Sequence, residues 1–190
     1  MDINSVKNSD KKMRNRPLIF LDTETTGLRI SAHEIIEIGA LKVNPKPPFN
    51  IVEELEIKVA PKHIETASPE AMKINGYTKE EWKCALSLEK ALERLDIFAE
   101  GGILAGYNVS FDWAMLDRAY FTLGKIDPFY YHRLDVMAMA YIKLFPKIKV
   151  KRFSLGEVCD YLKIKRENKH RALSDAKATY LVFKKLFEMR

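Results

Sequence analysis

Two carboxylates, Asp22 and Glu24, follow the first apolar run of the sequence in the hexapeptide Asp-Thr-Glu-Thr-Thr-Gly at residues 22–27. Side chains alternate between the two faces of a strand, so both carboxylates project to the same side at its carboxyl end. Because two like charges this close repel each other, the pair indicates a hard cation such as Mg²⁺ or Mn²⁺. An Asp-x-Glu pair occurs by chance in about every second chain of this length, whereas the five fixed residues of DxETTG occur in about one chain in ten thousand or fewer. The hexapeptide therefore predicts a metal site.

A third carboxylate, Asp112, ends the segment Asn-Val-Ser-Phe-Asp at residues 108–112, where a predicted strand gives way to a helix. This places Asp112 in the first helical turn at the carboxyl edge of the sheet, the edge where open α/β sheets bind ligands. An Asp in a first turn also stabilises the helix dipole without any further function. Taken alone, the position of Asp112 fits either interpretation.

The segment His-Arg-Ala-Leu-Ser-Asp at residues 170–175 opens the last predicted helix. The helical stripe through Ala172 and Ala176 puts Asp175 beside the inward face, while His170 lies in the loop or first turn and is able to approach the same cavity. A lone His before a helix is usually a surface residue, and a lone Asp in a first turn usually faces the helix dipole. The presence of all three segments in one chain favours a shared site.

Apolar periodicity indicates the elements that position these residues. Continuous or alternating apolar residues predict strands at 18–21, 34–43, 52–59, 103–107 and 130–134. Helical spacing predicts helices that end at Gly101, at Gly124 and before Pro146, and two more around 155–162 and 173–187. Ser110 is the predicted N-cap of the second helix. The first three strands fit an antiparallel meander, and the later alternation of helices and strands implies an α/β fold with a mixed central sheet, parallel strands included, and helices on both faces.

Length and composition exclude several classes of protein. The chain has 190 residues, 47% hydrophobic and 31% charged, which predicts one globular unit rather than a disordered or fibrous chain. No apolar run approaches the length of about 18 residues that spans a bilayer, and the amino terminus has no signal-peptide stretch. Cys84 and Cys159 lack the spacing of a metal site. We therefore expect a soluble protein with reduced thiols in a reducing compartment.

The net charge of +6 is concentrated in two segments. Residues 1–16 carry five Lys or Arg against two Asp and are predicted to form a flexible basic arm. Residues 147–171 carry nine basic against three acidic residues, so the rest of the chain is net negative. A basic segment of this kind indicates a polyanionic partner, although a solvated helix face has the same composition.

These motifs together resemble the DEDDh (DnaQ-like) family of 3′-to-5′ exonucleases, which has the ribonuclease H-like fold and includes proofreading epsilon subunits of bacterial replicative DNA polymerase. The segments that carry the resemblance occur in the order and spacing of that family, at 22–28, 34–40, 108–112 and 170–176. It extends from Leu18 to Phe187, with Tyr107 standing where many members have His. The sister DEDDy group would have Tyr at position 171, which is Arg here.

The resemblance implies a role for each residue of the site. Two divalent cations, Mg²⁺ or Mn²⁺, would be bound by Asp22, Glu24, Asp112 and Asp175. Glu24 would also act on the side of the nucleophile, and His170 would be the general base. Substrate contacts would come from the backbone around Thr25, from Leu28 as a wedge beside the last bases, and from Asn108 and Phe111 in the nucleotide pocket. Leu28 and Phe111 could equally be core-packing residues.

The resemblance further implies that residues 17–190 form an exonuclease domain that releases nucleoside 5′-monophosphates from a free 3′ end, single-stranded or frayed. DNA is the expected substrate. An RNA 3′-end-trimming enzyme of the same family and a catalytically silent nucleic-acid-binding module are the alternatives. A polymerase or a second copy of the chain is the expected protein partner, with no membrane association and a cytoplasmic location.

Overall fold

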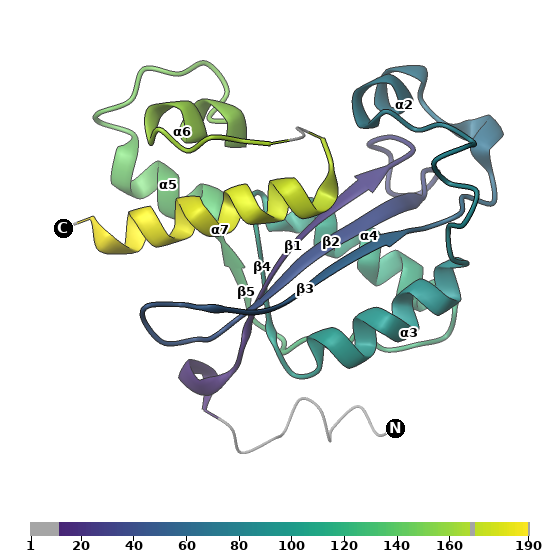
Figure 1. Cartoon of the computed structure of the whole chain (residues 1–190), viewed down its shortest axis with the longest axis horizontal. Helices are drawn as coiled ribbons and strands as arrows, with labels where there is room; N and C mark the ends of the chain where they lie inside the picture. The colour runs from purple at the N-terminus through teal and green to yellow at the C-terminus, as the bar shows by residue number, and fades with distance from the viewer. Residues whose placement is uncertain (1–11, 168–169, 190) are drawn as a thin grey trace.

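The computed structural model describes residues 12–167 and 170–189 of the chain. A five-stranded sheet has the order β3-β2-β1-β4-β5. Its strands are β1 (Leu18–Thr25), β2 (Ile35–Val43), β3 (Ile51–Lys58), β4 (Ile103–Gly106) and β5 (Arg133–Asp135). The first three are antiparallel neighbours, whereas β4 runs parallel to β1 and β5 parallel to β4. The predicted mixed sheet, with its antiparallel meander and parallel strands, is confirmed (Figure 1).

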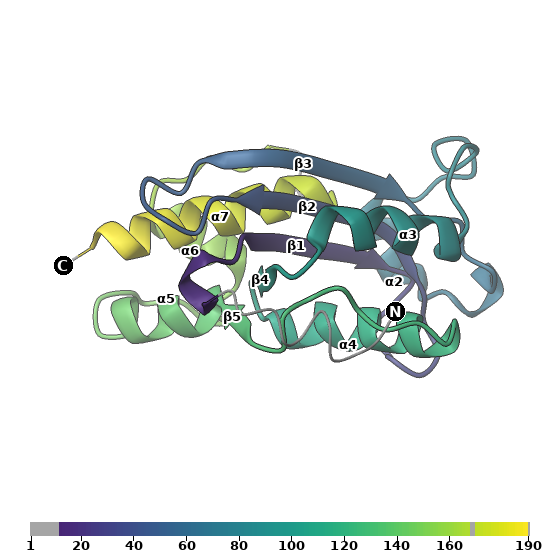
Figure 2. The ribbon, with the colours of Figure 1, turned by 90° about the horizontal axis from the view of Figure 1, so that it is seen from below.

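Helices cover both faces of the sheet (Figures 1 and 2). The helices of the described chain are α2 (Pro69–Asn75), α3 (Leu88–Ala99), α4 (Val109–Thr122), α5 (Val136–Leu144), α6 (Leu155–Tyr161) and α7 (Ala172–Glu188), with short 3₁₀ turns at Met13–Asn15 and Ile64–Thr66. One apolar core joins α5, α6 and α7 to one face, and a second core joins α3 and α4 to the other. A sheet covered in this way needs central strands that are apolar on both faces.

Strand β1 meets that need and thereby orients the carboxylates. Leu18 and Phe20 belong to the core under α7, whereas Ile19 and Leu21 belong to the core under α3 and α4. Because the alternation continues along the strand, Asp22 and Glu24 follow Phe20 onto the α7 face. The alternation of apolar residues along β1 thus determines that the carboxylates share a site with α7.

Helix α7 lies unusually close to β2, and Gly39 is the reason. A Cβ atom at Gly39 would stand 2.0 Å from the backbone nitrogen of Leu173 and 2.2 Å from the carbonyl carbon of Ala172. Only glycine leaves room for this approach of two backbones. The first turn of α7 consequently lies directly over β2.

Local details differ from the sequence prediction at the starts of two helices. Ser110 is not the N-cap of α4, because Asn108 takes that position with a left-handed backbone, φ 60°. Asn adopts this conformation more readily than most residues, so the helix begins two residues earlier than predicted. Helix α2 was not predicted, although Ser68 caps it by accepting from Ala71 N (3.3 Å) and Pro69 follows at the first helical position. The strand predicted at 130–134 is Arg133–Asp135.

Residues 1–11 of the predicted arm lie outside the described residues. The end of that arm, Arg16, is 2% exposed, donates to Gly101 O (3.0 Å) and stacks over the Tyr130 ring at 4.0 Å. In the described part of the chain, Cys159 is buried, Cys84 is exposed, and no helix has the length and apolarity needed to cross a bilayer.

The two edges of the sheet differ in kind. Edge strand β5 has three residues. Edge strand β3 is longer, and Glu53, Glu54 and Glu56 along it are exposed.

Candidate active site

Five predicted side chains meet where β1 and β4 end and α7 begins. Asp22 and Glu24 come from β1, and Asp112 from the first turn of α4, which follows β4. Asp175 lies in the first turn of α7, and His170 stands just before that helix. Burial first, and then the negative charges of the other three carboxylates, raise the pKa of Asp22 well above its ordinary value. The four carboxylates therefore share one electrostatic site.

Glu24, His170 and Asp175 are close enough to hold one metal ion. Each offers a ligand atom, and these atoms all lie within 4.8 Å of one another. His170 is exposed and Asp175 is 7% exposed, so the group is open to water on one side only. Oxygen-rich groups of this kind suit divalent cations.

Asp112 is anchored to β1 between the two strand carboxylates. Its Oδ1 accepts hydrogen bonds from Thr23 N (2.9 Å) and from Thr23 Oγ1 (2.8 Å). Thr23 was not predicted as a site residue, and its place between Asp22 and Glu24 on the opposite face is the signal that could have found it. Burial raises the pKa of Asp112 to about 7, although both hydrogen bonds from Thr23 oppose the shift.

The site disfavours full ionisation in the absence of a cation. Burial, followed by the charges of Asp175 and Glu37, raises the pKa of Glu24 to about 8. Glu24 and Asp112 are thus both partly protonated near neutral pH unless positive charge is supplied. This donor set of carboxylates is the physical observation that fits bound divalent metal.

Arg166, one of the nine basic residues of the segment 147–171, pairs with Asp175, a contact that the sequence did not predict. Its Nη2 lies 2.6 Å from Asp175 Oδ1, and each side chain is 10% exposed. Arg166 stands in the loop between α6 and α7, against Gly156, where a Cβ atom would lie 3.1 Å from its Nη1. The guanidinium also opposes the upward shift of the Asp22 pKa.

The basic segment 147–171 therefore divides into two groups. Arg166 and Arg171 form ion pairs with acidic side chains. The exposed members are Lys147, Lys149, Lys151, Arg152, Lys163 and Lys165, while Lys169 lies outside the described residues. Among the described residues of the segment, the exposed members are the candidates for contact with a polyanion.

The four predicted substrate-binding residues surround the carboxylates to different degrees. Leu28 is 81% exposed in the turn after β1, and Asn108 is exposed at the start of α4. Phe111 is half-buried and packs against the core under α3 and α4. The Thr25 hydroxyl donates to Gly27 O (2.8 Å), and Thr25 O accepts from Asn75 of α2 (3.1 Å). Their roles toward a substrate remain predictions.

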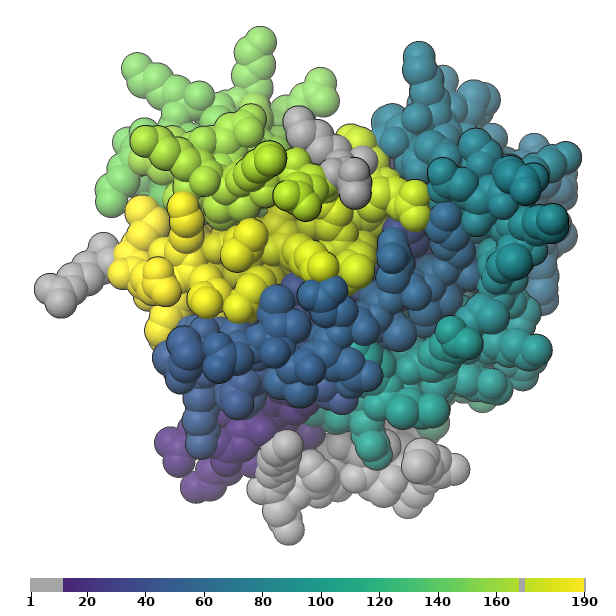
Figure 3. Space-filling view, viewed as in Figure 1, coloured from purple at the N-terminus to yellow at the C-terminus, as the bar shows by residue number. Residues whose placement is uncertain are grey.

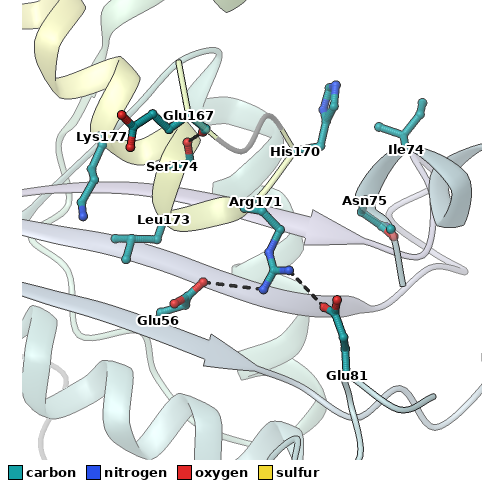
Figure 4. A pocket seen from close by; sticks show the side chains of 11 residues that line it. Glu56, Ile74, Asn75, Glu81, Glu167, His170, Arg171, Leu173, Ser174 and Lys177 are labelled. Atoms are coloured by element: carbon teal, nitrogen blue, oxygen red, sulfur yellow. Dashed lines mark hydrogen bonds and ion pairs between the residues drawn. The ribbon is translucent and has the colours of Figure 1, made fainter. Parts of the chain in front are cut away.

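A cleft of about 640 Å³ opens beside His170. Ile74, Asn75 and Gly76 line it from the α2 side, and residues 170, 171, 173, 174 and 177 line it from the α7 side. The surface is hollowed between these two parts of the molecule (Figure 3), and the side chains of His170 and Arg171 point in opposite directions at its wall (Figure 4). The cleft gives an extended ligand access to His170, which is the member of the five-residue site that lines it.

Comparison with known sequences gives one family. The sequence model of the exonuclease family, RNase_T, matches residues 19–183. A DNA polymerase III PolC-type from Thermotoga petrophila is 32% identical over 182 residues, covering 95% of this chain and 12% of that protein. The counterpart from Caldanaerobacter subterraneus is 31% identical over 171 residues, covering 90% of this chain and 11% of that protein. The chain thus spans about an eighth of the length of these relatives.

Solved structures share the fold. E. coli exonuclease I in complex with a dT13 oligonucleotide matches with a TM-score of 0.77 and 22% identity, covering 91% of this chain and 41% of that one. An exonuclease I from Methylocaldum szegediense matches with a TM-score of 0.75 and 20% identity, covering 92% and 41%. The expected ribonuclease H-like architecture is confirmed by these neighbours.

Proposed function

The chain belongs to the exonuclease family, and we propose that it is a divalent-metal-dependent 3′-to-5′ exonuclease that releases nucleoside 5′-monophosphates from DNA. One observation carries the proposal. Three separate sequence segments bring four carboxylates and a histidine to the same end of the sheet, and the histidine lines an open cleft. Such a set suits phosphodiester hydrolysis, because the carboxylates can bind divalent cations. The cations would offset the repulsion between the carboxylates and stabilise the negative charge of the phosphate.

Asp22, Glu24, Asp112 and Asp175 would hold two Mg²⁺ or Mn²⁺ ions. The raised pKa of Glu24 supports this assignment, since bound cations would offset the repulsion from Asp175 and Asp112 that causes part of the rise. When bound, the two ions would stabilise the charge on the attacking hydroxide and on the leaving 3′-oxygen. Thr23 holds Asp112 in one orientation for this purpose through its two hydrogen bonds.

His170 would be the general base of the reaction. It is exposed at the wall of the cleft, yet its ring lies within 4.8 Å of a ligand atom of Glu24 and of Asp175. A neutral imidazole at that place can take the proton of a water molecule that attacks the terminal phosphodiester. The exposed side lets water enter and lets the proton leave.

The substrate end would be read by the residues around the carboxylates. In the proposal, Leu28 wedges beside the last bases, Asn108 and Phe111 line the nucleotide pocket, and the backbone at Thr25 binds the 3′-hydroxyl. A single-stranded or frayed DNA end is supported by the names of the relatives, DNA polymerase III PolC-type, and by an exonuclease I solved with dT13. A polymerase or a second copy of the chain is the proposed partner, and a cytoplasmic location agrees with the unpaired cysteines of the described chain.

The proposal is tested with 5′-labelled DNA and RNA oligonucleotides, single- and double-stranded, with free or phosphorylated 3′ ends. We expect stepwise shortening of single-stranded DNA from a free 3′ end with Mg²⁺ or Mn²⁺, and none after EDTA treatment. His170→Ala should lower kcat by about 10²–10⁴-fold. His63→Ala removes an exposed histidine elsewhere and should leave the rate unchanged. Cleavage at full rate in EDTA would contradict the metal mechanism, and faster shortening of RNA would contradict the substrate.

A further inference from the structure

Glu37 is a completely buried carboxylate that the proposed mechanism does not use. It lies in β2 within the segment 34–40 and is 0% exposed. Its register partner on β1 is Glu24, so the two side chains project from the same face of the sheet. Two carboxylates directly opposite each other destabilise a sheet unless positive charge or hydrogen-bond donors offset the repulsion.

Both kinds of offset reach Glu37 from the beginning of α7. Its Oε1 accepts a hydrogen bond from Ala172 N (3.0 Å), and its Oε2 lies 3.3 Å from Arg171 Nε. Ala172 is the first residue of α7, and Arg171, the N-cap residue, makes no side-chain cap of its own. Glu37 therefore caps the helix from the neighbouring strand, and its charge favours the positive end of the helix dipole.

Arg171 extends this contact to two further segments. Its Nη1 lies 3.1 Å from Glu81 Oε2 and its Nη2 lies 3.8 Å from Glu56 Oε1, while its guanidinium faces the Trp82 ring at 5.8 Å. Figure 4 shows the side chain directed toward Glu56 and Glu81, away from His170. One guanidinium thus ties the beginning of α7 to β2, to β3 and to the loop that precedes α3.

The backbone directly before α7 has an unfavourable conformation that its contacts must stabilise. His170, directly before Arg171, has a left-handed backbone with φ 64°, a conformation that residues other than glycine adopt rarely. Asp175 follows four residues later in the first turn of the same helix. A small rotation of the beginning of α7 would move both residues relative to Glu24.

We propose that Glu37 and Arg171 are positioning residues, which fix His170 and Asp175 against Glu24 by clamping the beginning of α7 to β2. The inference rests on the proposed exonuclease function. Neither residue touches the substrate or the reacting atoms; both act through the geometry of the three ligating side chains.

The test uses Glu37→Gln and Arg171→Gln in the full chain, with Glu54→Gln as the matched control. Glu54 pairs with Lys177 (2.7 Å) and so also joins β3 to α7, but away from the beginning of the helix. Mn²⁺ affinity is measured without substrate by electron paramagnetic resonance, and kcat and KM with single-stranded DNA. We expect both clamp variants to bind Mn²⁺ about tenfold more weakly and to lose 10–100-fold in kcat, with KM changed by less than about threefold. Glu54→Gln should match the wild type.

The direction of the change in Mn²⁺ affinity distinguishes a positioning role of Arg171 from an effect of its positive charge alone. Removing the positive charge of Arg171 by itself would tighten cation binding, so tighter or unchanged affinity in Arg171→Gln overturns the proposal. Arg171→Lys keeps the charge but loses the planar fork, and we expect it to recover part of the loss. If Glu37→Gln does not fold, the Arg171 pair decides alone. A wild type that binds Mn²⁺ but degrades no oligonucleotide refutes the proposed function, whereas an active wild type with wild-type-like clamp variants refutes the clamp.

Discussion

Single side chains of the acidic site determine how the metal-free protein responds to pH. Asp112 and Glu24 have pKa values of about 7 and about 8 in the folded protein, against ordinary values of 3.8 and 4.5. Between these limits the folded state binds more protons than the unfolded state, so the free energy of unfolding decreases as pH rises. The stabilising contribution of the protonated forms is complete below about pH 4 and is lost by about pH 8.

We therefore expect urea unfolding in EDTA to show a decreasing free energy of unfolding from pH 5 to pH 8, counting these groups alone. Mn²⁺ should raise that free energy more at pH 8 than at pH 6, because it binds the ionised carboxylates. Asp112→Asn keeps an acceptor for Thr23 and should reduce the pH dependence. The same slope in this variant and in the wild type would show that Asp112 is ionised throughout.

Arg166 competes with cations for Asp175 if the ion pair at 2.6 Å has to open before metal binds. Arg166→Gln should then bind Mn²⁺ more tightly, by about threefold or more, as measured by calorimetry. Without metal the variant should be less stable by about 3 kcal/mol, since it leaves a buried carboxylate without its partner.

Lys125→Gln provides the comparison for Arg166. It removes a surface pair with Glu93 at 3.4 Å and should change stability by less than about 1 kcal/mol, with no effect on Mn²⁺ affinity. Unchanged Mn²⁺ affinity in Arg166→Gln would mean that Arg166 and the metal ions bind Asp175 together.

At the scale of elements, the position of α7 depends on the lack of a side chain at Gly39 in β2. Gly39→Ala would place a Cβ atom 2.0 Å from Leu173 N, so α7 must shift away from β2. We expect a loss of stability of about 1–3 kcal/mol and a fall in kcat of at least about tenfold, because His170 and Asp175 move with the helix. Thermal unfolding and single-turnover cleavage measure the two effects.

Gly124→Ala distinguishes this packing effect from backbone strain. Gly124 has φ 62° with open space around it, so alanine there should cost about 1 kcal/mol in stability with no change in kcat. Equal activity losses in both variants would point to general destabilisation rather than a displaced helix.

Elements with a strong period could be predicted from sequence, and so could the residues that they carry. The continuous apolar run at residues 18–21 and the long helical stripe of α7 predict the strand and the helix, and with them the places of Asp22, Glu24 and Asp175. Asn108 as N-cap and the short helix α2 were missed because each depends on a few backbone angles rather than on a repeated pattern. Arg166 could not be assigned, since a basic residue in a loop has the same sequence signal whether it meets solvent or a buried carboxylate.

Across the described part of the molecule, some basic side chains form ion pairs with acidic groups, and others, such as Lys151 and Lys165, are exposed to solvent where they can attract DNA. If Lys151 and Lys165 neutralise phosphates, affinity for single-stranded DNA should fall by about 0.7 log units per contact for each log unit of salt. The double variant Lys151→Glu and Lys165→Glu should flatten the slope by about 1.4 log units if both make contacts. Filter binding at salt concentrations from about 50 to about 300 mM measures the slope of affinity against salt.

Lys90→Glu, on the exposed side of α3, reverses one charge outside the basic segment, which is half of the charge change in the double variant. It should leave the slope close to that of the wild type. Equal flattening by Lys90→Glu would assign the salt dependence to net charge and not to phosphate contacts at the segment.

The two different edges of the sheet affect the tendency of the protein to aggregate at high concentration. An open edge strand offers unpaired amide and carbonyl groups to any other strand and is a common starting point for aggregation. Here β5 has three residues, too few for extended pairing, and β3 carries Glu53, Glu54 and Glu56 on its exposed length. Two molecules that approached through β3 would bring rows of like charge together. Glu56, which also pairs with Arg171 of the helix clamp, thus acts together with Glu53 and Glu54 to disfavour growth of the sheet into a polymer.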